Sequence, residues 1–123
     1  MTADERAERL RTEANIWLAT VRPDGRPHVS PIWFVWVDER VWICPVDGAV
    51  KTRNVRANPR VSVALESGSE PVVGEGTASA LPVADATSAV QAAFVDKYDW
   101  DITTDGDYGS VIEVAITRWL YGG

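Results

Sequence analysis

Six segments of the chain are rich in β-branched and aromatic residues, and turn residues bound each of them. The sequence therefore predicts six strands, at residues 16–22, 28–37, 41–46, 60–66, 72–81 and 110–121. Short connections separate the first three, and they contain the turn residues Pro23–Gly25 and Asp38–Arg40, so an antiparallel meander is expected. Gly74 and Gly76, inside the fifth strand, predict a bulge or a close approach of two backbones.

Both faces of the predicted strand at residues 28–37 are apolar. A sheet with one face in water would carry polar residues at alternate positions. One face is therefore expected to fill a barrel or sandwich, and the other to be covered by a helix or a second subunit. The two faces are Trp33, Val35 and Val37, and Ile32, Phe34 and Trp36.

Three helices are predicted outside these strands. Residues 3–14 are helical in composition, and because Leu10 is their only large apolar residue, this helix is expected on the surface. Residues 50–57 predict two turns of helix that stop at Asn58–Pro59, since the residue before proline avoids the helical conformation. A further helix is expected from Ala86 to about Tyr98.

The order of elements predicts a mainly β fold, a small six-stranded antiparallel split or closed barrel with two or three helices, because regular βαβ alternation is absent. At 123 residues, 46% of them hydrophobic, the chain is expected to form one domain over residues 1–123. The net charge of −6 argues against a general nucleic-acid or membrane-surface binder. The charged N-terminus, the single cysteine and the lack of long apolar runs predict a cytoplasmic protein.

One short stretch, "VKTRNVRANPR" at Val50–Arg60, carries four basic residues and no acidic one, although the chain as a whole is acidic. Unpaired backbone N–H groups at a helix start carry partial positive charge and suit an anion, above all a phosphate. Lys51 would act as a point charge, and Arg53 or Arg56 could add a forked contact. The alternative is a solvated helix whose bases balance acids elsewhere.

The stretches "WLATVRPDGRPHVSPIWF", "VKTRNVRANPRVSVAL" and "GEGTA" resemble, in that order, the split β-barrel flavin and deazaflavin oxidoreductases, which include the pyridoxamine phosphate oxidase-like proteins. The resemblance implies a homodimer with two cofactor sites at the interface and a small-molecule substrate. Each site would hold a flavin or deazaflavin ring with its phosphate at the basic helix. The C-terminal extension of the true pyridoxamine phosphate oxidases is not expected, and neither is their specific activity.

The resemblance also implies which residues meet the cofactor. Two positions depart from the family pattern: Cys44 stands where a Ser or Thr hydroxyl is common, and Ala49 where a basic residue is common. Both changes weaken the expected phosphate site, since a thiol is a poor donor. The implied cofactor-binding residues are Val29, Ser30, Cys44, Pro45, Val50, Lys51 and Asn54.

The sequence of the basic stretch most resembles the branch of this superfamily that uses coenzyme F420, which is largely actinobacterial. The resemblance therefore implies F420 as the cofactor, with FMN as the alternative. That implies hydride transfer from a reduced deazaflavin to a small electron-poor substrate. Trp33, Trp36 and Trp100 are candidates for the walls of the site, although the preferred interpretation places each of them in the core or at an interface. No general acid, catalytic residue or metal site can be assigned, and Cys44 with His28 is not expected to form a nucleophile–base pair. A non-catalytic flavin or haem carrier, or an interaction module without ligand, stays open.

Overall fold

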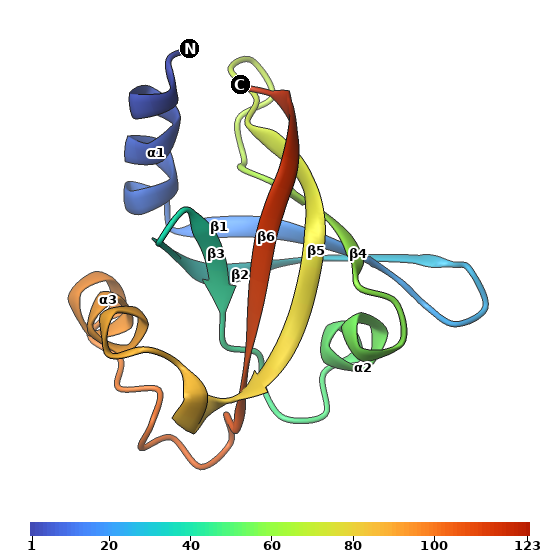
Figure 1. Cartoon of the computed structure of the whole chain (residues 1–123), viewed down its shortest axis with the longest axis vertical. Coiled ribbons are helices and arrows are strands. Elements are labelled where there is room, and N and C mark those ends of the chain that lie inside the picture. The colour runs from blue at the N-terminus through green and yellow to red at the C-terminus, as the bar shows by residue number, and fades with distance from the viewer.

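A computed structural model describes residues 1–123, and it shows six antiparallel strands closed into a barrel in the spatial order β1-β2-β3-β6-β5-β4. This confirms the predicted mainly β fold. Helices α2 and α3 lie on opposite sides of the barrel, and the two chain ends lie at the same end of it (Figure 1). The elements are α1 (Ala3–Thr12), β1 (Asn15–Val21), β2 (Pro27–Val37), β3 (Arg40–Ile43), α2 (Val50–Ala57), β4 (Arg60–Ala64), β5 (Val73–Pro82), the 3-10 turn η1 (Val83–Asp85), α3 (Ser88–Tyr98) and β6 (Ser110–Tyr121).

The inside of the barrel is the main hydrophobic core. It takes one face of every strand, and on β2 this is the face that carries Phe34, which is completely buried. Helix α1 lies on the surface, as expected, but its Leu10 is also completely buried in this core. Two arginines also hold the helix in place: Cζ of Arg6 lies 4.5 Å from the centroid of the Trp119 ring, and Arg9 donates to the carbonyl of Glu70. None of the helices is both long and apolar enough to cross a membrane.

A second core lies outside the barrel, where α3 covers the C-terminal half of β2 and the neighbouring β3. Phe94 of α3 packs there with Val35, Trp42 and Cys44. Helix α3 begins at Thr87, whose hydroxyl accepts a hydrogen bond from the backbone N–H of Val90 at 3.2 Å. The expectation that a helix covers the outer face of β2 is therefore confirmed for this half of the strand.

The N-terminal half of β2 has no such cover. Val29 is 59% exposed and Trp33 is 48% exposed, and both lie on the outer face of the strand. On the same face of β1, Trp17 is 37% exposed and pairs with Pro31. We call Trp17, Val29, Pro31 and Trp33 the apolar face. It is a contiguous patch of apolar side chains across two neighbouring strands.

The third strand differs most from its predicted ends, and the fifth strand contains the irregularities that its glycines predicted. The third strand was expected over residues 41–46, but β3 ends at Ile43 and the chain continues extended without a ladder partner. Pro45 has no N–H to donate to a ladder, so the pairing stops before it. The fifth strand contains the predicted irregularities, because the register of β5 with β6 shifts next to Gly74 and again next to Gly76.

Candidate functional site

Helix α2 begins without a side-chain cap. Gly48 has a left-handed φ of +77°, a conformation that glycine adopts at no steric cost, and Ala49 follows as the N-cap residue. The first hydrogen bond of the helix runs from Arg53 N to Ala49 O at 3.4 Å, so the N–H groups of Val50, Lys51 and Thr52 precede it. Alanine offers no side-chain oxygen to these donors, and they are free to meet an anion.

The basic residues of α2 are not neutralised by carboxylates. The four salt bridges of the structure join Arg9–Glu13, Arg11–Glu8, Arg26–Asp24 and Arg40–Glu113, and none involves the helix. Lys51 is partly buried and has no hydrogen-bond or ion-pair partner, and burial lowers its pKa. The ammonium group of Lys51 is therefore partly buried and unpaired in a protein that is acidic overall. This argues against the alternative, a solvated helix whose basic residues balance acidic residues.

Two polar atoms near this helix are buried without a partner. They are Nδ1 of His28 and Oγ of Ser30, on successive inward-facing positions of β2. Burial lowers the pKa of His28, and the positive charges of Arg22 and Lys51 lower it further. Buried polar atoms normally have a hydrogen-bond partner, so these two mark a place where a ligand or water belongs.

Asn54 connects α2 to the barrel. Its side chain is only 3% exposed, and its Nδ2 donates a hydrogen bond to Oγ1 of Thr20 at 3.0 Å. Thr20 pairs with His28 across β1 and β2, so the contact fixes the helix beside the unpartnered histidine. The structure shows Asn54 as a positioning residue for α2. Its contact with a cofactor stays a prediction.

The remaining predicted residues do not all lie together. Cys44 faces the second core, where its Sγ donates to Ser110 O at 3.4 Å. Val29 lies on the apolar face, opposite to its neighbour Ser30. Pro45 lines a small cavity of about 100 Å³ together with Arg53 and Arg56, beside the start of α2. The structure thus brings Ser30, Val50, Lys51 and Asn54 towards one site, and places Cys44 elsewhere.

Cys44 is expected to be unreactive in the folded protein. Burial, reinforced by the negative charges of Asp105 and Asp47, raises the pKa of its thiol to about 12. We expect the native thiol to react with an alkylating reagent at pH 8 at least about 100-fold more slowly than the thiol of the urea-unfolded chain. Similar rates in the two states, followed by mass spectrometry, would contradict this burial.

The same shift has a consequence for stability. An ordinary thiol starts from a pKa of 9.0, so above that pH the unfolded chain releases the proton of Cys44 while the folded chain retains it. The stabilising contribution of this group is therefore complete below pH 9 and is lost as the pH rises towards 12.

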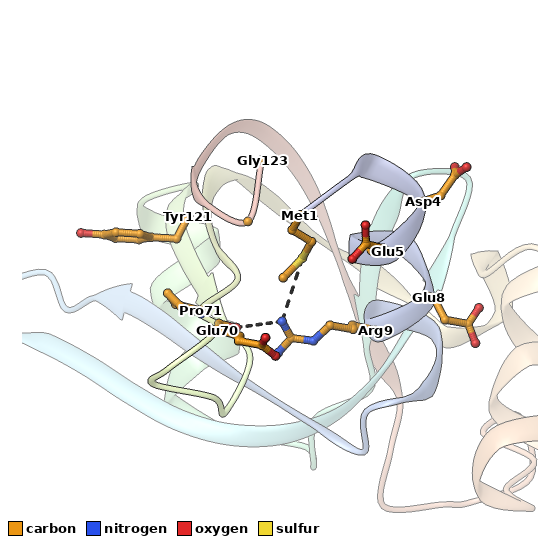
Figure 2. Close-up of a pocket in the computed structure, with 10 residues that line it drawn as sticks. Met1, Asp4, Glu5, Glu8, Arg9, Glu70, Pro71, Tyr121 and Gly123 are labelled. Atoms are coloured by element: carbon orange, nitrogen blue, oxygen red, sulfur yellow. Dashed lines mark hydrogen bonds between the residues drawn. The ribbon is translucent and has the colours of Figure 1, made fainter.

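The largest cavity, about 830 Å³, is not at the basic helix. It lies between α1 and the C-terminal end of the chain, and Figure 2 shows Arg9 reaching across it. The Arg9 guanidinium bonds to Glu13, to the carbonyl of Glu70 at 2.7 Å and to the Met1 sulfur at 4.0 Å. The guanidinium of Arg9 therefore already has partners, and the other charged side chains around the cavity are acidic. This cavity has none of the features that suit the start of α2 to an anion.

The three tryptophans proposed as walls separate into two groups. Trp33 and Trp100 line one cavity of about 360 Å³, and their ring centroids are 6.2 Å apart. Trp36 instead packs against Trp119 near α1, with ring centroids 6.2 Å apart. Trp33 and Trp100 therefore share a cavity beside α3 that contains no residue of α2, and their predicted place in a cofactor site stays a prediction.

Sequence reasoning did not include His28 among the predicted cofactor-binding residues. Its Nδ1 is buried without a partner, and it pairs with Thr20, the residue that Asn54 of α2 contacts. Alternation along β2 places His28 on the same face as Ser30, and the hairpin register places it beside β1, so the pattern contained that signal.

Comparison with known proteins gives matches along the whole chain. The family described as pyridoxamine 5'-phosphate oxidase matches residues 2–121. A solved structure described as an F420 reductase is 29% identical, with a TM-score of 0.72 over 91% of this chain and 93% of that one. A conserved hypothetical protein from Mycobacterium tuberculosis is 24% identical, with a TM-score of 0.80 over 97% and 82%. A haem-binding protein from Mycobacterium smegmatis is 26% identical, with a TM-score of 0.73 over 100% and 56%.

Proposed function

We propose, from the premise that the chain belongs to the pyridoxamine 5'-phosphate oxidase family, that it is an oxidoreductase that uses the deazaflavin coenzyme F420. Members of this family bind flavins or related cofactors, and the F420 reductase at 29% identity supports the deazaflavin. The reduced deazaflavin, when bound, supplies a hydride to a small electron-poor substrate. The observation that carries the proposal is the uncapped start of α2 beside an unpaired lysine and two unpartnered buried polar atoms.

The residues at α2 fit a phosphate group. The N–H groups of Val50, Lys51 and Thr52 can donate to its oxygens, and the Lys51 ammonium adds a full charge. His28 and Ser30 can fill their open hydrogen-bond positions with a polar part of the same ligand. Asn54 holds the helix at the correct place through Thr20. Arg53 and Arg56, on the exposed side, suit further negative charge such as a polyglutamate tail.

We further propose that a second copy of the chain covers the part of the apolar face formed by Trp17, Val29 and Pro31. Trp33 instead stacks on Tyr98 and lines a cavity beside α3. Trp17 and Val29 are 37% and 59% exposed, and a cluster of large apolar side chains on neighbouring strands is typical of a protein interface. Val29 lies on this face, and its neighbour along β2, Ser30 of the basic site, lies on the opposite face of the same strand. A partner chain seated there would cover the exposed Trp17 and Val29 on the outer side of β1 and β2.

Haem binding is the second candidate function. The mycobacterial haem-binding protein at 26% identity supports it, and so does His28, the only histidine of the chain, whose Nδ1 is buried without a partner. FMN is the other flavin alternative, because a ribityl phosphate presents the same anion to α2.

Titration of the purified protein with F420, FMN and haem separates these proposals. We expect saturable quenching of F420 fluorescence at micromolar concentration, a much weaker response to FMN, no Soret shift with haem, and the mass of two chains by light scattering. Tighter binding of FMN than of F420 would make FMN the cofactor, and a Soret band would make haem the ligand. The mass of a single chain would contradict the proposal that a second copy covers part of the apolar face.

A further inference from the structure

We propose that the cavity beside the C-terminal end of α3 binds an organic cation that carries a methylated ammonium group. This site is separate from the basic site at α2, has the opposite charge and does not rest on the proposed cofactor. Its volume is about 360 Å³, large enough for a small ligand. The lining residues are Trp33, Tyr98, Trp100 and Tyr108, with the carboxylates of Asp99 and Asp105.

Four aromatic rings surround this cavity in more than one orientation. Trp33 stacks on Tyr98 with the ring centroids 4.4 Å apart and the planes at 7°. Trp100 stands nearly perpendicular to this pair, at 73° to Trp33. Tyr108 in turn stands at 82° to Trp100, with centroids 4.9 Å apart. Rings at right angles allow a rounded cation to contact the negative face of more than one ring at once.

Two carboxylates supply the charge that such a ligand needs. Asp105 is held in place, because its Oδ2 accepts from Trp100 Nε1 and its Oδ1 accepts from the backbone N–H of Asp107, both at 3.3 Å. Asp99 ends α3 in a left-handed conformation with φ of 52°. Neither takes part in a salt bridge, and residues 99–109 contain four aspartates and no basic residue. The negative charge of the cavity is therefore uncompensated.

The combination of rings and carboxylates selects a methylated cation over other positive ligands. A metal ion needs at least three well-placed donors, and no such group of His, Cys, Asp and Glu side chains occurs in the structure. A primary ammonium is strongly hydrated and would lose that water for few hydrogen bonds, whereas a methylated ammonium is weakly hydrated and suits aromatic faces.

Choline and its uncharged isostere 3,3-dimethylbutan-1-ol test the proposal on the full chain. The two have nearly the same shape, so a difference between them measures the charge. We expect choline to quench the tryptophan fluorescence with saturation and to bind at least about tenfold more tightly than the alcohol. Equal binding of the two compounds, or a choline signal that does not saturate, would overturn the proposal.

Two matched pairs of variants locate the site. Trp33→Leu removes a cavity wall, whereas Trp17→Leu removes a tryptophan of the same apolar face that does not line the cavity. Asp105→Asn removes a lining carboxylate, whereas Asp107→Asn removes the same charge from the same loop outside the cavity. We expect the first variant of each pair to weaken choline binding about tenfold and the second to leave it within about twofold.

The pairs also separate binding from folding. Trp33→Leu loses the stack on Tyr98, and Asp105→Asn keeps only one of the two oxygens that accept hydrogen bonds, so both variants are expected to melt somewhat below the wild type and still to fold. Equal losses of choline binding within either pair, at a temperature where all four variants are folded, would place the choline somewhere other than this cavity.

Discussion

Replacing Gly76 with alanine is expected to destabilise the protein by about 3 kcal/mol and to lower its melting temperature by roughly 10 °C. A Cβ atom at this position would lie 2.1 Å from the carbonyl oxygen of Ala115, far inside contact distance. The clash is with the backbone of β6, so no side-chain rotation can relieve it. The strand must shift, and the bulge that fixes the register of β5 with β6 would be lost. Thermal unfolding followed by circular dichroism measures the effect.

Gly68→Ala is the matched control for this substitution. A Cβ at Gly68 meets nothing within 4 Å, and its backbone φ is not in the left-handed region, so its melting temperature should stay within about 2 °C of the wild type or rise slightly. If the Gly76→Ala and Gly68→Ala variants have the same melting temperature, the backbones of β5 and β6 do not approach each other as closely as described.

Replacing Lys51 with alanine is expected to weaken cofactor binding by roughly 10- to 100-fold, in proportion to one lost charge-assisted hydrogen bond. Lys51 is partly buried at the start of α2 and has no ionic partner in the protein, so its removal breaks no existing pair. The folded state should therefore remain intact while the affinity for the phosphate-bearing ligand falls. Fluorescence titration with F420, or with FMN if that binds more tightly, measures the change.

Arg118→Ala provides the control, because it changes the net charge by the same amount. Arg118 is exposed on β6 and lies outside every cavity described above. We expect the dissociation constant of the Arg118→Ala variant for the cofactor to stay within about twofold of the wild-type value at the same salt concentration. Equal effects of the two substitutions would mean that overall charge, and not a site at α2, governs the binding.

Most of the fold could be predicted from local patterns. Residues 50–57 and 110–121 were predicted with their observed ends, because Asn58–Pro59 and the long apolar alternation of the last strand leave few alternatives. The third helix begins two residues later than predicted, since Thr87 caps it and Val83–Asp85 forms a 3-10 turn first. The complete burial of Leu10 could not be predicted, because it depends on where the end of the barrel lies.

The candidate site was less predictable than the fold. The basic character of α2 is visible in the sequence, and Lys51 lies without a partner where the helix begins. Cys44 was grouped with it through the family resemblance, but the alternation of β3 turns its side chain towards α3. The cage of aromatic rings was only partly anticipated, because Trp33 and Tyr98 are 65 residues apart and meet through the packing of α3 on β2.

The closure of the barrel limits how folded copies of this chain can associate. Every one of the six strands has hydrogen-bonded neighbours on both sides, so no strand is a free edge along its whole length. The ladders differ in length, however: β2 pairs with β3 only over Phe34–Val37, and its N-terminal half pairs with β1 alone. Strand addition, the route by which many β proteins capture extended peptides or polymerise, is therefore restricted to such short segments, and most of the barrel can associate only through its side-chain surfaces.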